Sequence, residues 1–215
     1  SGAVLMNMTV EGSITYAATA KNSPTGLVGH LHGTMYNVTN RATISASSSA
    51  DLLYLGGLAG WVHGNGKLID CVNEGNVILG KTSKFGYVGG IAGALTRDVA
   101  TRACYATGSV TGHTVGGIHG AMYEAAVAMG CWNSMTLNGS GRNGGVTGYV
   151  AEGEDQSSEG IFIYHCYYTA DIPVCGDSSV NYEGHYFIEN CARMESDTPT
   201  AQEIENMNNQ LKDNS

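Results

Sequence analysis

The chain has 215 residues, of which 31 are glycine and only 13% are charged, against about a quarter in ordinary globular domains. Three prolines exclude a collagen or a proline-rich linker, and a hydrophobic share of 42% excludes wholesale disorder. The net charge is uneven: residues 1–150 carry 8 basic and 6 acidic groups (+2), and residues 151–215 carry 2 basic and 13 acidic groups (−11). Because neither part offers a basic face, we expect no nucleic-acid partner. The absence of a long apolar run predicts no transmembrane segment, and the start at Ser1 favours a mature or excised segment.

A short glycine motif, G-x-x-G, recurs five times along the chain, with Leu, Ile or Val in its second position. The intervals between successive copies are 31, 33, 27 and 28 residues. The copies occupy residues 26–29, 57–60, 90–93, 117–120 and 145–148. Repetition at this period indicates a repeat architecture, in which each unit packs mainly on its neighbours.

A second motif follows the glycine motif at a fixed distance in the middle three copies. It reads Cys71-Val72-Asn73-Glu74-Gly75-Asn76-Val77, Cys104-Tyr105-Ala106-Thr107-Gly108-Ser109-Val110 and Cys131-Trp132-Asn133-Ser134-Met135-Thr136-Leu137. Degenerate copies begin at Val38 and Cys166, and Glu11-Gly12-Ser13-Ile14 resembles the end of one more. The two motifs together therefore define one repeating unit.

The repeats are rich in Gly, Val, Ile and Thr and are broken every few residues, which favours short strands over helices. At about 3.3 Å per residue, 27–33 residues are long enough for one coil of a three-sided solenoid. We therefore predict an all-β fold, a right-handed parallel β-helix (β-solenoid) of about five coils. Equivalent side chains would then stack in ladders about 4.8 Å apart.

The C-terminal part differs in composition. We assign residues 1–191 to the solenoid, with an acidic insertion at about 151–160, and residues 192–215 to a C-terminal cap. Thr200 and Glu203 form a capping box, and Ile204, Met207 and Leu211 fall on one helical face. This pattern predicts a short helix that covers the last coil, whose open strand edges need protection. A solvated tail is the alternative.

The Cys-aromatic-Asn-x-Gly-x-Val motif, together with Val88-Gly89-Gly90-Ile91-Ala92-Gly93, resembles the GLUG repeat. That repeat occurs in secreted and surface proteins of bacteria, including adhesin-like proteins of gut Bacteroidetes, and in non-catalytic parts of immunoglobulin A1 peptidases. The resemblance covers roughly residues 10–170. It implies a β-solenoid and an extracellular setting, and it supplies no catalytic residues. Thr25 and His119 depart from the family pattern.

Four cysteines (Cys71, Cys104, Cys131 and Cys166) share one repeat position, so we expect a buried column of free thiols, not disulfides or a zinc site. Cys175 and Cys191 lie outside this pattern, and a disulfide between them is left open. A structural ladder is also expected for Asn40, Asn73 and Asn133, which share another repeat position.

Aromatic residues follow three of these cysteines. Because strand side chains alternate between faces, Tyr105, Trp132 and Tyr167 would form an outward column, and flat aromatic rings of this kind stack on sugars. The alternative is that the rings stabilise the sheet through cross-strand contacts. His32 and His63 also share a repeat position, but two imidazoles make a weak metal site, and we expect no metal or cofactor. His30 and His119 have no evident partner.

Acidic residues suggest two further possibilities. The insertion around Glu152, Glu154 and Asp155 is expected to be an exposed loop, and its spacing matches no known calcium loop. Only Asp177, Glu183 and Glu189 approach the clustering that glycosidase chemistry needs. The common hydrolase, zinc-protease and nucleotide-binding motifs are absent from the sequence, so we do not expect an enzyme.

These observations favour a non-catalytic extracellular or cell-surface module, secreted or anchored at the outer membrane. Its role would be adhesion, binding of a ligand such as a glycan, or spacing within a larger surface protein. The expected partners are a glycan or a host or matrix surface, and other domains of the same protein. The alternative is a polysaccharide-active enzyme of parallel β-helix fold, either a lyase or a glycoside hydrolase.

Overall fold

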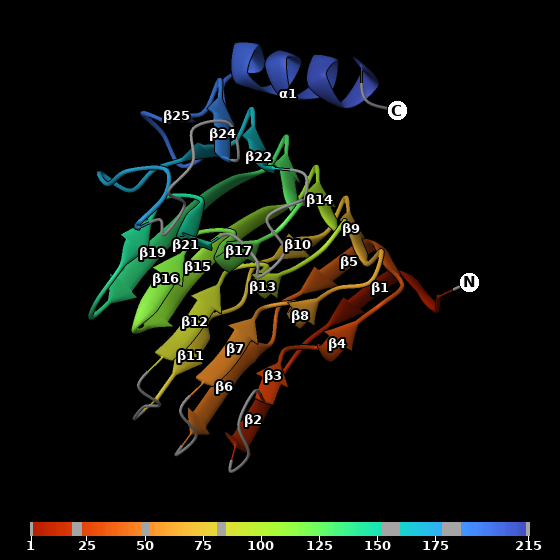
Figure 1. Ribbon diagram of the computed structural model, residues 1–215, viewed down its shortest axis with the longest axis vertical. Coiled ribbons are helices and arrows are strands. Elements are labelled where there is room, and N and C mark those ends of the chain that lie inside the picture. Colours follow the sequence, from red (N-terminus) through yellow and green to blue (C-terminus); the bar gives the residue numbers. More distant parts are fainter. Residues whose placement is uncertain are drawn as a thin grey trace.

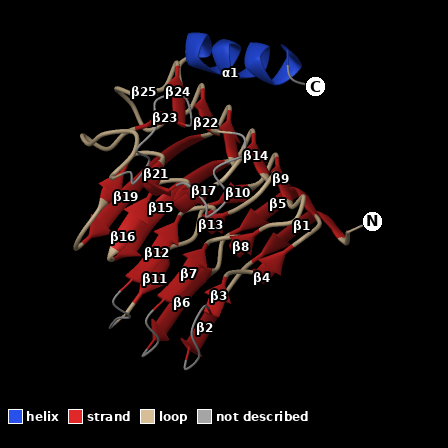
Figure 2. Cartoon of the chain, in the orientation of Figure 1, coloured by secondary structure: helices blue, strands red, loops and turns tan. Residues whose placement is uncertain are grey.

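The computed structural model describes residues 2–18, 23–48, 52–80, 85–151, 160–177 and 186–213. In this part of the chain, short strands stack in parallel into a β-solenoid and one helix follows them (Figures 1 and 2). Every strand pair in these residues is parallel. Each strand pairs with its equivalent in the neighbouring coil, so that Tyr105, for example, lies opposite Trp132. The predicted all-β parallel β-helix is thus confirmed.

Each coil passes through three sheets, here called A, B and C. Sheet B contains β3 (Ser23–Thr25), β7 (Leu52–Gly56), β12 (Phe85–Gly89), β16 (Thr114–Gly116) and β20 (Asn143–Gly144). Sheet C contains β4 (Val28–Leu31), β8 (Ala59–Val62), β13 (Ala92–Leu95), β17 (His119–Tyr123) and β21 (Thr147–Ala151). A glycine motif joins each strand of sheet B to the next strand in sheet C.

Sheet A is the largest and receives the chain from sheet C. The chain enters sheet A through β1 (Val4–Val10), β5 (Thr34–Asn40), β9 (Lys67–Ile69), β14 (Ala100–Arg102), β18 (Val127–Met129), β22 (Ile161–Tyr164) and β24 (Tyr186–Glu189). It continues through β2 (Ser13–Ala18), β6 (Thr43–Ser48), β10 (Val72–Asn73), β11 (Val77–Leu79), β15 (Tyr105–Gly112), β19 (Trp132–Gly139), β23 (Tyr167–Tyr168) and β25 (Ala192–Arg193).

A left-handed backbone residue turns the chain inside sheet A in every coil. Its φ lies between 47° and 60° at Asn7, Asn37, Asp70, Ala103, Gly130, His165 and Asn190. Residues in this region are mostly Gly, Asn or Asp. The residue that directly follows each left-handed position belongs to one column that stacks from coil to coil. The members of this column are Met8, Val38, Cys71, Cys104, Cys131, Cys166 and Cys191. The four cysteines predicted to form this column are fully buried, and Cys191 extends it.

The glycine motif allows sheets B and C to approach closely. A Cβ on Gly57 would overlap the side chain of Asn73, and one on Gly117 would overlap that of Asn133. A Cβ on Gly93 would strike the backbone of β7 in the preceding coil. The first glycine therefore leaves space for the asparagine of the second motif, and the second glycine lets the two sheets meet at a sharp corner.

The helix α1 (Ala201–Asp213) packs against the last coils (Figure 1). The predicted capping box is present: the Thr200 N–H donates to Glu203 Oε2 at 2.6 Å, and the Glu203 N–H donates to Thr200 Oγ1 at 3.3 Å. Met207 is buried and Leu211 lies against Gly130, whereas Ile204 is 45% exposed. The packed helix face is therefore narrower than the sequence predicted. No helix of the described residues is long and apolar enough to span a membrane.

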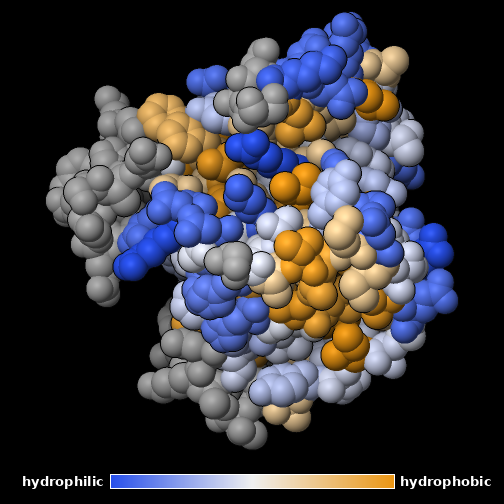
Figure 3. Space-filling view, turned by 90° about the vertical axis from the view of Figure 1, so that its right-hand side faces the viewer, coloured by the Kyte–Doolittle hydropathy of each residue, from blue (hydrophilic) through white to orange (hydrophobic). Residues whose placement is uncertain are grey.

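The surface is mixed in character. On the face shown in Figure 3, hydrophobic residues gather near the middle, and the outer side of α1 at the top is hydrophilic. Large exposed apolar side chains concentrate on β1, where Val4, Met6 and Met8 are between 41% and 60% exposed. In the described part of the chain β1 is the first strand of its sheet, so these side chains have a coil on one side only.

Candidate ligand-binding surface

The predicted aromatic column exists in register, but it does not form a three-ring outer surface. The rings of Tyr105 and Trp132 stack with centroids 4.6 Å apart and planes 6° apart. Tyr167 is only 4% exposed because it packs with Met207 of α1, and Trp132 contacts the same cluster. Asn206 Nδ2 also donates to the Tyr167 hydroxyl at 3.4 Å. The expectation of a continuous exposed strip is therefore wrong at Tyr167, because the C-terminal helix covers that end.

A longer series of aromatic residues lies where sheets B and C meet. We call it the aromatic seam and define it by Tyr54, Trp61, Tyr87, Tyr123 and Tyr149. Strand alternation explains its position: Leu53 and Leu55 enter the solenoid core, so Tyr54 between them points outward. Sequence reasoning missed the seam, although Tyr54 and Tyr87 each stand three residues before a glycine motif.

The rings of the seam form an unbroken series of contacts along the solenoid axis. Tyr54 contacts Trp61 with ring centroids 5.6 Å apart, and it stacks on Tyr87 at 5.7 Å. Tyr87 stacks in turn on Tyr149 at 5.7 Å. The ring of Tyr123 meets those of Tyr87 and Tyr149 edge-on, at 6.5 and 6.4 Å. These separations lie in the range of favourable aromatic pairs.

The residues of the seam differ in solvent exposure. Tyr54 and Tyr87 are 8% exposed, and Trp61, Tyr123 and Tyr149 are half-buried. Burial raises the pKa of Tyr54, Tyr87 and Tyr123. The Tyr123 hydroxyl is hydrogen-bonded to those of Tyr54 and Tyr87. The phenols therefore stay neutral at physiological pH and hold one another in place.

Polar groups lie along and beside the seam. The indole N–H of Trp61 donates to Thr96 Oγ1 at 2.9 Å. At one end the guanidinium of Arg142 lies 4.7 Å from the ring centre of Tyr149, and its Nε pairs with Asp177 Oδ2 at 2.7 Å. Apolar ring faces with a few oriented polar groups are typical of small-molecule sites.

Three histidines lie at the other end of the seam. His63 stacks on Trp61 with ring centroids 4.7 Å apart, and His30 lies 5.4 Å from Trp61. His32 contacts His63 with a centroid separation of 3.7 Å. The structure thus gives the predicted His32–His63 pair a third member, His30, for which the sequence offered no partner.

The cysteines are all free thiols. Cys191 belongs to the buried column, where its sulfur accepts from the Cys166 N–H at 3.4 Å, and Cys175 lies elsewhere, bridged to Thr147 through the backbone. The open question of a Cys175–Cys191 disulfide is thereby answered in the negative. Burial raises the pKa of Cys104 and Cys166 well above the usual thiol range. Cys104 and Cys166 therefore act as packing groups.

The asparagines of the second motif are fully buried at Asn40, Asn73 and Asn133. Asn40 Nδ2 donates to Asn73 Oδ1 at 2.7 Å, and Ala106 then interrupts the ladder. Asn133 Nδ2 instead donates to the Gly145 carbonyl at 2.8 Å, which lies 12 residues further along the chain. Each side chain satisfies buried polar backbone groups, which is a structural role.

The carboxylates do not assemble into a glycosidase pair in the described residues. Glu74 pairs with Arg41 at 2.7 Å, Glu124 with Arg97 at 3.1 Å, and Asp177 with Arg142. Glu189 ends β24, and Glu183 lies outside the described residues, as do residues 152–159 of the acidic insertion.

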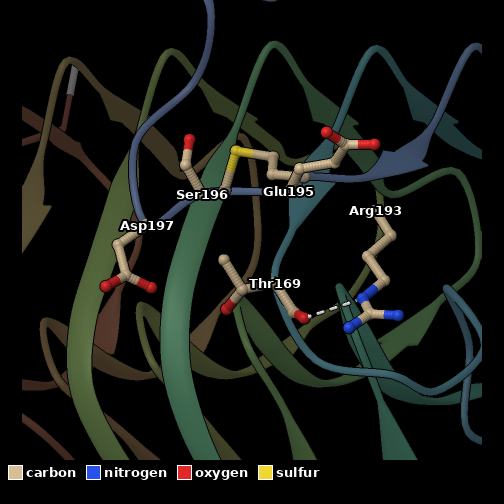
Figure 4. Close-up of a pocket in the computed structure, with 6 residues that line it drawn as sticks. Thr169, Arg193, Glu195, Ser196 and Asp197 are labelled. Atoms are coloured by element: carbon tan, nitrogen blue, oxygen red, sulfur yellow. Dashed lines mark hydrogen bonds between the residues drawn. The ribbon is translucent and has the colours of Figure 1, made fainter.

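A polar pocket of about 580 Å³ lies beside the start of the C-terminal segment (Figure 4). It is lined by Thr169, Arg193, Met194, Glu195, Ser196 and Asp197. The Arg193 guanidinium donates to the Thr169 carbonyl at 3.1 Å and to Asp171 Oδ1 at 2.9 Å. Because the cation already has these partners, the aromatic seam remains the stronger candidate site. Comparison with known proteins finds no matching family, no similar curated protein and no similar solved structure.

Proposed function

We propose that this chain is a non-catalytic extracellular repeat module that binds carbohydrate along the aromatic seam, within a larger adhesive surface protein. The unbroken series of ring contacts from Trp61 to Tyr149 carries this proposal. Sugar rings present flat faces of C–H groups that stack on aromatic faces, while their hydroxyl groups need hydrogen-bonding neighbours. Trp61, Tyr123 and Tyr149 are half-buried and present part of their rings, and Arg142 and the imidazoles of His30 and His63 lie beside them. The likeness of the repeats to the GLUG repeat supports the extracellular setting.

Binding without turnover is favoured by the state of the nearby carboxylates. Glycoside hydrolysis needs two facing carboxyl groups, one of them held protonated. Glu124, the residue after Tyr123, pairs with Arg97. Asp177 pairs with Arg142 at the end of the seam. This supports a binding module over the polysaccharide-active alternative.

A glycan array followed by calorimetric titration with the best ligand tests the proposal. Trp61→Ala and Tyr149→Ala should each weaken binding about tenfold or more, as expected for aromatic anchors. Phe162→Ala is the matched control, because Phe162 stacks on Phe187 in sheet A with centroids 5.0 Å apart, outside the seam. Thermal unfolding of each variant separates loss of binding from loss of fold.

Three results would contradict the proposal. Equal losses in the seam variants and in Phe162→Ala would remove the seam from the binding site. Release of reducing sugar would indicate an enzyme. An array without any hit would favour a spacer.

A further inference from the structure

We propose that His30 and His63 form a binding site for a divalent transition-metal ion of the zinc and copper class, with the remaining coordination positions open to water or to an added ligand. The two residues come from neighbouring coils, at the end of β4 and just after β8. His30 is exposed and His63 is half-buried, so an ion can reach both rings from solvent.

The distance between the two nitrogens carries this assignment. His30 Nδ1 and His63 Nε2 lie 3.1 Å apart. Two imidazole nitrogens bound to one zinc ion at about 2.0–2.1 Å are separated by about 2.9 Å at a right angle and about 3.3 Å at the tetrahedral angle. The observed separation lies between these limits. Small rotations of the rings would direct both lone pairs at a common point and replace the hydrogen bond by the ion.

One neighbouring indole contacts both rings. Trp61 stacks on His63 with planes 28° apart and also contacts His30, so both imidazoles rest against one indole. The indole of Trp61 therefore supports both proposed ligands.

The site is open. Within the described residues, no group of three or more His, Cys, Asp or Glu side chains forms a metal site. Two protein ligands leave coordination positions free, as in metal sites that bind an exogenous ligand. The affinity order expected for such a nitrogen site places Cu²⁺ above Zn²⁺, and Mg²⁺, which prefers oxygen, should not bind.

Calorimetric titration of the whole chain with ZnCl₂, CuCl₂ and MgCl₂ at neutral pH tests the site. We expect one Zn²⁺ or Cu²⁺ per chain, and His30→Gln and His63→Gln should each weaken binding more than about tenfold. His113→Gln is the matched control, because His113 lies beside Thr114 away from this group, and it should leave binding unchanged. His32→Gln should also retain binding, since His32 contacts His63 but is not assigned as a ligand.

Absence of binding by the wild-type chain at millimolar Zn²⁺ and Cu²⁺ would overturn the proposal, as would unchanged affinity in His30→Gln or His63→Gln. Loss of binding in His32→Gln would overturn the assignment of these two ligands. Unfolding temperatures without metal confirm that each variant is folded. Glycan binding measured in the presence of a chelator keeps this result separate from the proposed carbohydrate function.

Discussion

Lowering the pH should destabilise this protein through His119, a histidine that is fully buried inside the solenoid on β17. Its Nε2 is hydrogen-bonded to Thr101 Oγ1 at 3.0 Å, and its Nδ1 has no hydrogen-bond partner among the described residues. Burial lowers the pKa of this imidazole to about 3. The folded chain therefore keeps His119 neutral over most of the acidic range.

The size of the effect follows from the difference between the folded and unfolded pKa values. In the unfolded chain His119 takes up a proton near pH 6.5, whereas in the folded chain it does so only near pH 3. The unfolded state thus binds more protons between these values, and stability falls as the pH falls through that window. From pH 7 to pH 5 the free energy of unfolding should decrease by about 2 kcal/mol from this residue alone.

Urea unfolding of the wild type and of His119→Thr at pH 7 and pH 5 measures this contribution. Thr147 occupies the equivalent position in the next coil, so threonine is compatible with the column. His63, whose pKa is also lowered, contributes to the pH dependence of both proteins, and the difference between them isolates His119. If both proteins lose the same stability between the two pH values, the reasoning is refuted.

Three further predictions concern the fold. Cys104→Asp should destabilise the chain by about 3–5 kcal/mol or prevent folding, because it buries an unpaired charge, whereas Cys104→Val should remain folded in circular dichroism, since Val38 occupies the same column. Gly57→Ala and Asn73→Ala should each lower the urea midpoint. The double variant should lose about 1 kcal/mol less stability than the sum of the two single variants, because a Cβ on Gly57 would occupy the space of the Asn73 side chain. Strict additivity of the two losses would contradict this. Met207→Ala should cost about 2 kcal/mol in urea unfolding, while Ile204→Ala, at an exposed position of the same helix, should change stability by less than about 0.5 kcal/mol; equal losses would show that Met207 does not anchor α1.

The repeating parts of the fold were predictable from the sequence because a parallel solenoid converts sequence period into spatial contact. Residues one repeat apart, such as Cys71 and Cys104, must stack when their strands pair in register. The same reasoning located the buried asparagines and the stacked rings of Tyr105 and Trp132. It missed Cys191, which follows no glycine motif, although Asn190 before it is a residue type that tolerates the left-handed corner.

Contacts between different positions of the repeat required the tertiary structure. Tyr54 and Trp61 lie on two sheets, and only the sharp glycine corner brings their outer faces together as a seam. His30 lies opposite Trp61 in register, and His63, two residues further along the chain, meets it diagonally. Tyr167 is covered because α1 folds back onto the last coils. A period fixes which residues stack along the axis, whereas the angles between sheets and the path of a non-repeating tail depend on packing across the whole molecule.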